Sequence, residues 1–313
     1  MIRSPDRIGS NADLRILVTG GAGFLGHYVI DRLRREGLEP ISVDIIPNDP
    51  EAQFLDVTDF PTVRDAFANA KPEVVIHLAA EAATTEKGRG AESRAKPMRY
   101  FATNFTGTLN VLEACRLSGI NKVIYMSSFS VYGRTTQAIT EDTPLTPNNP
   151  YGSSKACAEL AARCYATNYG TRVQIFRSPL LCGEGQKELN ALREFVLSAT
   201  RGDPLAIVGK GEHVREWLHP IDVADAFVKA LPYFDDMDAK CETFVLGSTP
   251  ISMKQLAHLV VKTVGKGHIE FREPTAQVFD QYSDSRRAQR VLGWKANITV
   301  EEIVRRVASE VHL

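Results

Sequence analysis

The sequence predicts an α/β protein whose main body is a doubly wound parallel sheet, followed by a smaller mixed α/β lobe in the C-terminal part. Three observations lead to this fold class. Short apolar runs alternate with amphipathic helical patterns from residue 14 to about residue 178. A glycine-rich turn directly follows the first apolar run, and the alternation weakens after residue 178. Strands that alternate with helices are joined by right-handed crossovers, which give a parallel sheet covered on both faces.

The strands of the main sheet are predicted from short apolar runs that end at turn residues. In chain order they are 14–20, 40–44, 52–56, 73–80, 122–128 and 172–177. The helices between them are predicted from apolar residues that recur on one helical face. They are 24–37, which ends at Gly37, about 59–70, about 98–118, and a helix that begins at Tyr151.

The C-terminal part mixes shorter elements, which predicts a separate lobe. The strands expected there are 205–209, 242–247 and 268–271, and the helices are about 187–201, 222–231, 252–264 and 299–310. We therefore divide the chain into a disordered lead-in at 1–12, a Rossmann-type domain at 13–178, and 179–313 as mainly a substrate-binding lobe. Segments near 215–247 are expected to return to the Rossmann-type domain.

The composition argues against several classes of function. Lys and Arg number 37 against 38 Asp and Glu, so no basic excess attracts nucleic acid or an anionic membrane. No apolar run approaches the ~18 residues that span a bilayer, and the N-terminus lacks the apolar core of a signal peptide. Five cysteines without a C-x-x-C spacing argue against a disulfide framework or a zinc site. We expect a cytoplasmic protein that binds no metal, nucleic acid or membrane.

The turn after the first strand carries Gly20, Gly23 and Gly26 at the start of the first helix. Glycines at this spacing permit a tight turn, let the backbone approach a pyrophosphate, and let helix and strand pack closely. The helix N-terminus adds unpaired N–H donors and a partial positive charge. The pattern predicts a dinucleotide site that includes Phe24 and Leu25; the alternative is a glycine-rich turn that binds nothing.

Asp44, which ends the next strand, indicates which dinucleotide binds. A carboxylate there accepts hydrogen bonds from a ribose diol and repels a 2′-phosphate, and residues 45–48 (IIPN) supply no Arg or Lys. NAD is therefore predicted rather than NADP, which makes the first domain an NAD-binding domain. Asp56 and Val57, after the third strand, would lie near the adenine; the alternative is that they cap the helix beginning near Asp59.

The stretch 151–162 (YGSSKACAELAA) places Tyr151 and Lys155 on one face of a helix. A buried ammonium stabilises a phenolate, so we expect Lys155 to lower the pKa of Tyr151 from about 10. A phenol activated in this way acts as a general acid or base while a hydride leaves the same carbon. Ser128, at the end of a buried strand, has a hydroxyl able to orient the reacting oxygen. The alternatives are a surface Tyr and Lys on an ordinary helix, and a serine that only forms a turn.

Taken together, these segments resemble the extended short-chain dehydrogenase/reductase family, including its NAD-dependent sugar-nucleotide epimerase/dehydratase branch. The resemblance covers nearly the whole chain. It rests on the glycine turn and on HLAA (77–80), Tyr100 with Asn104-x-x-Gly107-Thr108, SSFSVYG (127–133), YGSSK (151–155), 209–227 and 284–294.

The resemblance implies a role for each matching residue. Tyr151 would be the acid/base, Lys155 its electrostatic partner that also binds the nicotinamide ribose, and Ser128 the catalytic serine. The cofactor site would be lined by Leu78, Ala79 and Ala80 and braced by Asn104, and the substrate would meet Ser128, Phe129, Ser130 and Arg215. Arg215 matches an arginine that contacts a sugar-nucleotide diphosphate; its alternative is a surface ion pair, for example with Glu216.

Two departures from the family pattern bear on the reaction. Dehydratases of the branch follow the catalytic serine or threonine with an acidic residue, whereas Phe129 and Ser130 stand here, which disfavours 4,6-dehydration. Leu180 and Cys182 replace an asparagine and a tyrosine after the strand 172–177. Leucine cannot donate a hydrogen bond, so part of the diphosphate clamp is missing.

These observations favour one function and leave two others open. The favoured one is a nucleotide-sugar epimerase, similar to UDP-glucose 4-epimerase, that acts through a transient keto intermediate. The second is a net NAD-dependent dehydrogenase or reductase of a free sugar, sugar acid or other small hydroxyl or carbonyl substrate. The third is a non-catalytic NAD-binding regulator. Family members often dimerise through two helices, which implies a homodimer through 98–118 and 151–169 here.

Overall fold

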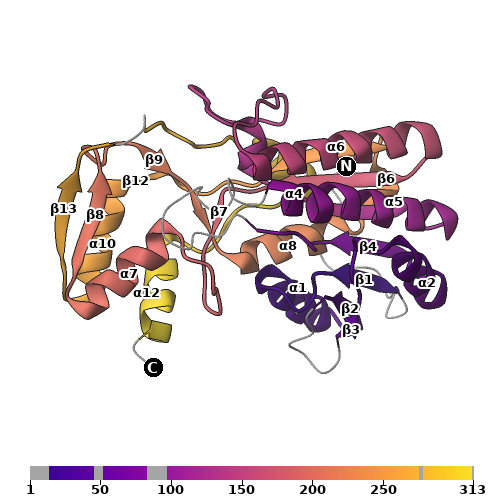
Figure 1. Ribbon diagram of the computed structural model, residues 1–313, viewed down its shortest axis with the longest axis horizontal. Helices are drawn as coiled ribbons and strands as arrows, with labels where there is room; N and C mark the ends of the chain where they lie inside the picture. The colour runs from indigo at the N-terminus through magenta and orange to yellow at the C-terminus, as the bar shows by residue number, and fades with distance from the viewer. Residues whose placement is uncertain (1–13, 46–51, 83–96, 275–277, 312–313) are drawn as a thin grey trace.

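The structure, a computed structural model, describes residues 14–45, 52–82, 97–274 and 278–311. Figure 1 shows two parts, a sheet wrapped by helices on the right and a smaller group of helices and short strands on the left. The disordered lead-in expected at 1–12 lies outside the described residues.

The main sheet has seven strands in the order β11–β6–β5–β4–β1–β2–β3, and every neighbouring pair is parallel. Their bounds are Ile16–Thr19 (β1), Ile41–Asp44 (β2), Gln53–Phe54 (β3), Val74–His77 (β4), Lys122–Met126 (β5), Arg172–Arg177 (β6) and Cys241–Val245 (β11). From β1 the sheet is built outward in both directions, through β2 on one side and β4 on the other. The predicted doubly wound α/β fold is confirmed.

Helices cover both faces of this sheet. One core cluster contains α1 (Phe24–Arg35), α8 (Pro220–Ala230) and α11 (Arg286–Leu292), and the other contains α2 (Phe60–Ala70), α5 (Gly107–Leu117) and α6 (Pro150–Tyr169). In α1 the buried residues include Val29 and Leu33, which lie on one face of the helix. In α6 the sheet-facing residues are Ala158, Ala162 and Ala166, whose small side chains let the helix lie close to the strands.

One helix differs from its prediction. The segment expected as a single helix at about 98–118 consists of α4 (Pro97–Tyr100), a π-helical turn η1 (Phe101–Thr106) and α5. The wider turn buries Asn104, whose side chain bonds to residues outside the helix. Helical periodicity does not report such a turn, because the turn depends on partners that are distant in the sequence.

The C-terminal lobe has its core where α7 (Ala191–Arg201), α10 (Met253–Val264) and α12 (Val300–Val311) pack together. Its short strands pair two by two: β7 (Leu180–Leu181) with β10 (Trp217–Leu218), β9 (Val214–Arg215) with β12 (Ile251–Ser252), and β8 (Pro204–Val208) with β13 (His268–Arg272). Two further short helices are η2 (Phe129–Tyr132) and α9 (Tyr233–Asp236). Within the described residues, no helix combines the length and apolar character needed to cross a membrane.

Candidate active site

The residues singled out from the sequence lie at one edge of the main sheet. Because the strands are parallel, the segments that follow their carboxyl ends meet at the same edge. The glycine turn follows β1, Asp44 ends β2, residues 78–80 follow β4, and Ser128 follows β5. Tyr151 lies in the first turn of α6, which packs against this sheet.

The glycine turn has the shape of a dinucleotide site. Gly20 has a φ of +71°, and a Cβ there would lie 2.7 Å from the backbone nitrogen of Ala79. A Cβ on Gly26 would lie 2.2 Å from the carbonyl oxygen of Gly20, so glycine is required for α1 to start this close to the turn. Gly23 is the N-cap of α1 and gives it no side-chain cap. The N-terminus of α1 can therefore receive a pyrophosphate, and the turn fits NAD.

The two residues after Gly23 support the turn with their side chains. Phe24 packs edge-on against Tyr28, with 5.7 Å between the ring centroids. Leu25 packs against the core cluster that contains α1 and α8. Both side chains are half-buried. We therefore expect these residues to contact NAD through their backbone N–H groups.

Asp44 is linked to the glycine turn. Its Oδ2 accepts a hydrogen bond from the backbone N–H of Ala22 at 3.2 Å, and its side chain is half-buried. A carboxylate thus lies beside the turn that is shaped for the dinucleotide, as a preference for NAD requires. Of the residues that follow, Ile45 is half exposed, and 46–51 lie outside the described residues.

Asp56 and Val57 have structural partners of their own. The Oδ1 of Asp56 accepts hydrogen bonds from the backbone N–H and the hydroxyl of Thr58, both at 2.8 Å. Val57 is buried against Gly107, and its carbonyl accepts a hydrogen bond from the side chain of Asn110 at 2.9 Å. Asp56 therefore forms the turn before α2, close to the capping role that the sequence left as an alternative. Contact with the adenine stays a prediction.

Leu78 and Ala79 lie against the glycine turn. The backbone N–H of Leu78 donates to the carbonyl of Thr19 at 3.0 Å, and that of Ala79 donates to the Thr19 hydroxyl at 3.3 Å. Ala80 follows as an exposed residue. The position beside Gly20 suits the cofactor-lining role that the family resemblance implies, which stays a prediction.

His77 is a buried residue that sequence reasoning did not assign to the site. Its Nδ1 lies 2.7 Å from the Thr19 hydroxyl, and its Nε2 lies 3.0 Å from the Thr108 hydroxyl. The Thr108 hydroxyl donates its own proton to the carbonyl of Asn104, so it accepts from His77, and the ring proton is on Nε2. Burial lowers the pKa of His77 to about 3, and the charge of Lys155 acts in the same direction. The ring is therefore neutral and ties β1 to α5.

Asn104 joins the start of α6 to the segment after β4. Its Oδ1 accepts from the backbone N–H of Glu81 at 2.8 Å, and its Nδ2 donates to the carbonyl of Glu81 at 3.1 Å and to the Ser154 hydroxyl at 3.0 Å. Ser154 in turn donates to the carbonyl of Tyr151 at 2.8 Å. These bonds suit the bracing role expected for Asn104, which stays a prediction.

Tyr151 lies close enough to Ser128 for the serine side chain to affect its pKa. Burial has the largest effect and raises the pKa of Tyr151, Ser128 lowers it, and nearby Tyr100 raises it. The ring of Tyr100 packs edge-on at 5.9 Å from that of Tyr151. The prediction that Lys155 lowers the pKa of Tyr151 is therefore wrong for this structure, in which desolvation has the largest effect.

Lys155 directs its ammonium toward the sheet. Its Nζ donates to the carbonyl of Met126 at 2.8 Å and lies 5.0 Å from the centroid of the Tyr125 ring. Burial lowers the pKa of Lys155 to about 8, against the opposing effect of Glu159. The ammonium is thus held by the end of β5, one turn along α6 from Tyr151.

Of the four residues assigned to the substrate, the three near the end of β5 differ in what they can contact. Ser128 is the N-cap of η2, and its hydroxyl accepts from the backbone N–H of Ser130 at 3.2 Å. Ser130 is half-buried beside it. Phe129 is only 2% exposed and packs edge-on against Tyr132 at 6.0 Å, so its side chain belongs to the core. The substrate-binding prediction for the Phe129 side chain is corrected for that reason.

Arg215 is buried, and its guanidinium is held by a later segment of the chain. Its Nη1 donates to the carbonyls of Val214, at 2.8 Å, and of Phe279, and the guanidinium carbon lies 4.8 Å from the Phe279 ring centroid. Glu216 accepts hydrogen bonds from the backbone N–H of Ser283 at 2.9 Å and from its hydroxyl at 2.7 Å. The surface ion pair considered as an alternative for Arg215 does not describe this buried arrangement. Contact of Arg215 with a diphosphate stays a prediction.

Leu180 and Cys182 belong to the lobe's apolar core. Leu180 pairs with Trp217 between β7 and β10 and packs against the cluster that contains α7, α10 and α12. Cys182 is fully buried, and burial raises the pKa of its thiol to about 12. Neither side chain offers a strong hydrogen bond to a phosphate.

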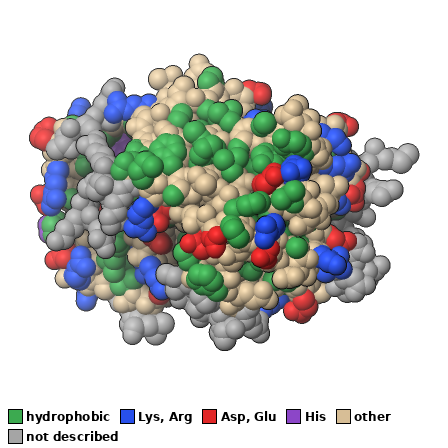
Figure 2. All heavy atoms as spheres, turned by 45° about the vertical axis from the view of Figure 1, so that its right-hand side comes forward, with side chains coloured by type: hydrophobic (Ala, Val, Ile, Leu, Met, Phe, Trp, Pro, Cys, Tyr) green, Lys and Arg blue, Asp and Glu red, His purple; other side chains and the backbone are tan. Residues whose placement is uncertain are grey.

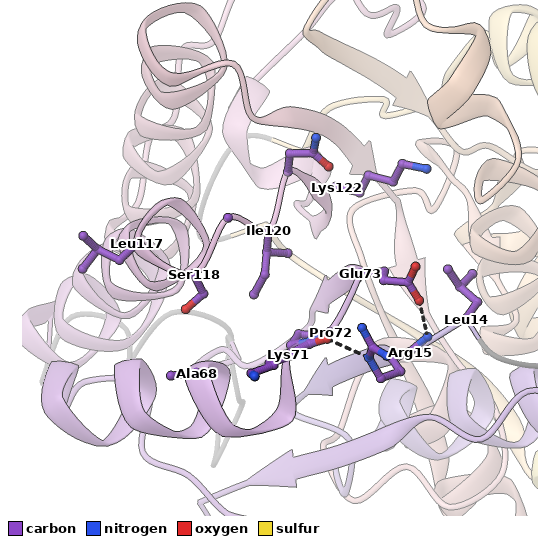
Figure 3. A pocket seen from close by; sticks show the side chains of 12 residues that line it. Leu14, Arg15, Ala68, Lys71, Pro72, Glu73, Leu117, Ser118, Ile120 and Lys122 are labelled. Carbon is purple, nitrogen blue, oxygen red and sulfur yellow. Dashed lines mark hydrogen bonds between the residues drawn. The ribbon is translucent and has the colours of Figure 1, made fainter.

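A separate hollow of about 640 Å³ lies at the opposite edge of the sheet, beside the amino ends of β1, β4 and β5. Figure 3 shows Arg15 in it, donating to the carbonyl of Lys71 and, through its backbone N–H, to Glu73. The catalytic candidates are at the other edge, so this hollow is no part of the site.

Sequence reasoning also missed a buried charged pair behind the catalytic candidates. Glu159, one turn beyond Lys155 on α6, bonds to Arg177 at the end of β6. The signal was present in the sequence, because a single acidic residue interrupts an otherwise small and apolar stretch of helix. A charge at such a position has to find a buried partner.

Comparison with known proteins identifies the family. A model described as NAD dependent epimerase/dehydratase family matches residues 16–247. The putative UDP-glucose 4-epimerase of Methanocaldococcus jannaschii is 30% identical, over 94% of this chain and 97% of its own length. The UDP-glucose 4-epimerase of Thermotoga maritima with UDP-glucose has a TM-score of 0.84 at 28% identity, over 95% of this chain and 98% of that one. The enzyme of the same name from Brucella ovis in complex with NAD has a TM-score of 0.86 at 26% identity, with the same shares covered.

These findings confirm the family resemblance read from the motifs, and they confirm NAD as the cofactor. The matched region contains the glycine turn, Ser128, Tyr151, Lys155 and Arg215. This chain is an enzyme that belongs to the NAD-dependent epimerase/dehydratase family.

Proposed function

We propose that this enzyme is a nucleotide-sugar epimerase, acting on a UDP-sugar through a transient keto intermediate. The observation that carries the proposal is the grouping of Ser128, Tyr151 and Lys155 beside a turn shaped for NAD. The names of the relatives described above, which are UDP-glucose 4-epimerases, support the substrate class.

Tyr151 and Ser128 carry the proton chemistry in this proposal. Tyr151 takes the proton of the substrate hydroxyl and later returns it to the keto oxygen, while Ser128 holds the same oxygen. Bound NAD would accept and return the hydride, and its positive ring would lower the pKa of Tyr151. Lys155, fixed on the carbonyl of Met126, adds positive charge and binds the ribose hydroxyls.

The residues that follow Ser128 support epimerisation over dehydration. Elimination of water needs a further acid or base near the intermediate, and neither Phe129 nor Ser130 carries a carboxylate. Phe129 is buried in the core, and Ser130 is hydrogen-bonded to Ser128. Reduction of the keto intermediate on its other face needs no additional group.

A second candidate function is a net dehydrogenase or reductase of a free sugar or sugar acid. Leu180 favours it, because an apolar side chain stands where the family places an amide that meets the substrate phosphates. A substrate without a diphosphate would not need that amide.

The test is turnover of a panel of UDP- and dTDP-sugars by the purified enzyme, with the products separated. We expect conversion of a UDP-sugar to its epimer without growth of absorbance at 340 nm. Stoichiometric growth at 340 nm with a free sugar or uronate would establish the second candidate instead. NAD binding with no turnover of any substrate would point to the non-catalytic regulator.

Replacement of Tyr151 tests the assignment of the acid/base. We expect Tyr151→Phe to lower kcat by about 10²- to 10⁴-fold, since that is the usual contribution of general acid–base catalysis. Tyr165→Phe, whose hydroxyl bonds to Glu113 on α5, is the matched control and should keep the wild-type kcat. Equal kcat for Tyr151→Phe and wild type would remove Tyr151 from the mechanism.

The enzyme works as a homodimer in this proposal, through the outer faces of α5 and α6. Large apolar side chains lie exposed on or beside these helices: Met98 (75%), Leu117 (52%), Leu160 (60%) and Tyr169 (56%). Figure 2 shows apolar side chains gathered in the upper part of a face that includes the right-hand side of Figure 1. Sedimentation should give twice the 34.5 kDa of one chain, and Leu160→Glu should return it to one chain.

Two further expectations remain part of the proposal. The enzyme is cytoplasmic, which suits its five free cysteines. Residues 13–178 form the NAD-binding domain, 179–313 form mainly the substrate lobe, and segments near 215–247 return to the NAD-binding domain. The pairing of β11 with β6 supports that return.

A further inference from the structure

A buried ion pair lies directly behind the catalytic candidates. Arg177 donates from Nε to Oε1 of Glu159 at 2.9 Å and from Nη2 to Oε2 at 2.6 Å. The two side chains are 2% and 0% exposed. A pair this deep is costly to desolvate, and apolar residues of similar volume are often as stable, so stability alone does not account for it.

The carboxylate of Glu159 reaches the dipeptide that precedes Ser128. The Ser127 hydroxyl donates to Oε1 of Glu159 at 2.5 Å. Ser127 lies between Met126, whose carbonyl accepts from the ammonium of Lys155 at 2.8 Å, and Ser128. One hydrogen bond to Glu159 therefore fixes the segment that orients both the ammonium and the catalytic serine.

Arg177 anchors the segment on the other side of Ser128. Its Nη1 donates to the Tyr132 hydroxyl at 2.7 Å and to the carbonyl of Glu141 at 3.2 Å. Tyr132 ends η2, the short helix that Ser128 caps. The ion pair thus holds the chain before Ser128 through its carboxylate and the chain after Ser128 through its guanidinium.

Glu159 also acts on the charge of Lys155. The groups that interact with the ammonium are neutral His77 on β4, Tyr125 on β5 and Glu159 on α6. Tyr151 lies one turn before Lys155 on α6, and Arg177 on β6 is paired with Glu159. Burial raises the pKa of Tyr125 well above its ordinary value, so this phenol is neutral too. Glu159 raises the pKa of Lys155 against the larger effect of burial. Its carboxylate thus favours a charged Lys155 near neutral pH.

We propose that Glu159 and Arg177 are positioning residues of the catalytic site, whose ion pair holds Ser128 and the ammonium of Lys155 through Ser127. The proposal rests on the proposed function, because it takes Ser128, Tyr151 and Lys155 as the catalytic group. Neither positioning residue touches the substrate.

The first experiment removes both charges at once, so that no buried ion is left unpaired. Glu159→Gln/Arg177→Met should fold, lower kcat about tenfold at pH 8 with KM within twofold, and move the alkaline fall of activity about one pH unit lower. The matched control is Glu242→Gln/Arg287→Met, which removes another ion pair of the same sheet domain. Its pH profile should equal that of the wild type. A wild-type kcat and profile in the Glu159 double variant would overturn the proposal.

A single substitution at Ser127 separates the effect of its hydrogen bond to Glu159 from the effect of the buried charges. Ser127→Ala leaves the ion pair intact and removes only the contact at 2.5 Å. It should lower kcat several-fold without moving the pH profile, and an unchanged kcat would overturn the positioning of Ser128. This result stands even if the double variant fails to fold.

The second readout needs no substrate. In protein labelled with ¹³C at the lysine ε-carbon, the Lys155 signal is identified by its loss in Lys155→Met. Its titration midpoint should lie near the wild-type pKa of about 8. It should fall by about one unit in the Glu159 double variant and not in the Glu242 control. An equal midpoint would overturn the inference even if the enzyme proves not to be an epimerase.

Discussion

The sheet domain and the C-terminal lobe each bury a carboxylate, and they satisfy it differently. In the sheet domain, Glu159 receives two hydrogen bonds from the Nε and Nη2 of Arg177 and one from Ser127. In the lobe, Glu216 receives its hydrogen bonds from the backbone N–H and hydroxyl of Ser283. Burial raises the pKa of Glu216 to about 7, against the effect of those bonds. The comparison teaches that a paired carboxylate lies beside the catalytic candidates, whereas the lobe carboxyl is about half protonated near pH 7.

The largest effect expected from this difference is on folding stability. Glu159→Gln leaves the guanidinium of Arg177 buried without its counter-charge, which should lower the free energy of unfolding by about 3–5 kcal/mol. Glu216→Gln leaves no buried ion behind and should not lower the free energy of unfolding at pH 7. Urea unfolding of both variants and the wild type measures the two values. Equal losses of unfolding free energy in Glu159→Gln and Glu216→Gln would contradict the difference between the two carboxylates.

The second effect is the pH dependence that Glu216 gives to stability. The pKa of Glu216 is about 7 in the folded protein, against an ordinary value of 4.5. The folded state therefore binds the proton more tightly than the unfolded state does. The resulting stabilisation is complete below about pH 4.5 and is lost as the pH rises through 7, to a total of about 3 kcal/mol. Glutamine does not titrate, so Glu216→Gln should remove this pH-dependent loss of stability.

The measurement is the difference in unfolding free energy between wild type and Glu216→Gln at pH 5, 6, 7 and 8. Asp222, whose pKa burial raises to about 6, contributes a slope of the same sign to both proteins and cancels in the difference. A difference that stays constant across this range would show that Glu216 titrates normally.

The third effect separates two glycines with similar backbone geometry. Gly20 in the sheet domain and Gly211 in the lobe have φ of +71° and +70°, and a Cβ on either would lie 2.7 Å from its nearest neighbour. Alanine should therefore destabilise the protein at both positions by about 1–3 kcal/mol. Only Gly20→Ala should also weaken NAD binding, by about tenfold or more, since Gly20 lies in the turn that we propose binds the pyrophosphate. Calorimetric titration with NAD distinguishes them.

Much of the sheet domain was predictable because its elements are determined by neighbouring residues. The glycine turn, the apolar runs and the Tyr151–Lys155 spacing each lie within a few residues, so local pattern predicts them. The π-helical turn around Asn104 was not predictable, because it depends on Glu81 and Ser154, which are distant in the sequence. The pKa of Tyr151 was predicted in the wrong direction for a related reason: the spacing to Lys155 reports a neighbour but not the burial of the phenol.

The lobe was less predictable, because its short strands are defined by their partners. β7, β9, β10 and β12 have two residues each, too few for any periodicity to show. The environment of Arg215 depends on Phe279, which is 64 positions away in the chain. Sequence reasoning could place Arg215 in a family motif but could not find the ring and the carbonyl that hold it.

The smallest expected effect concerns the choice of dinucleotide, which we expect Asp44 in the sheet domain to control. In the wild type, the N–H of Ala22 donates to Asp44 at 3.2 Å, and Asp44→Asn keeps an oxygen that can accept this bond. The substitution removes the negative charge that repels a 2′-phosphate. We expect NADP affinity to rise several-fold while NAD affinity falls by no more than that, because the ribose diol retains one acceptor. Asp280→Asn in the lobe, whose Oδ1 accepts from the N–H of Val214, is the matched control and should change neither affinity. Fluorescence titrations with both dinucleotides make the comparison, and an unaltered NAD-to-NADP ratio in Asp44→Asn would show that this carboxylate does not select the cofactor.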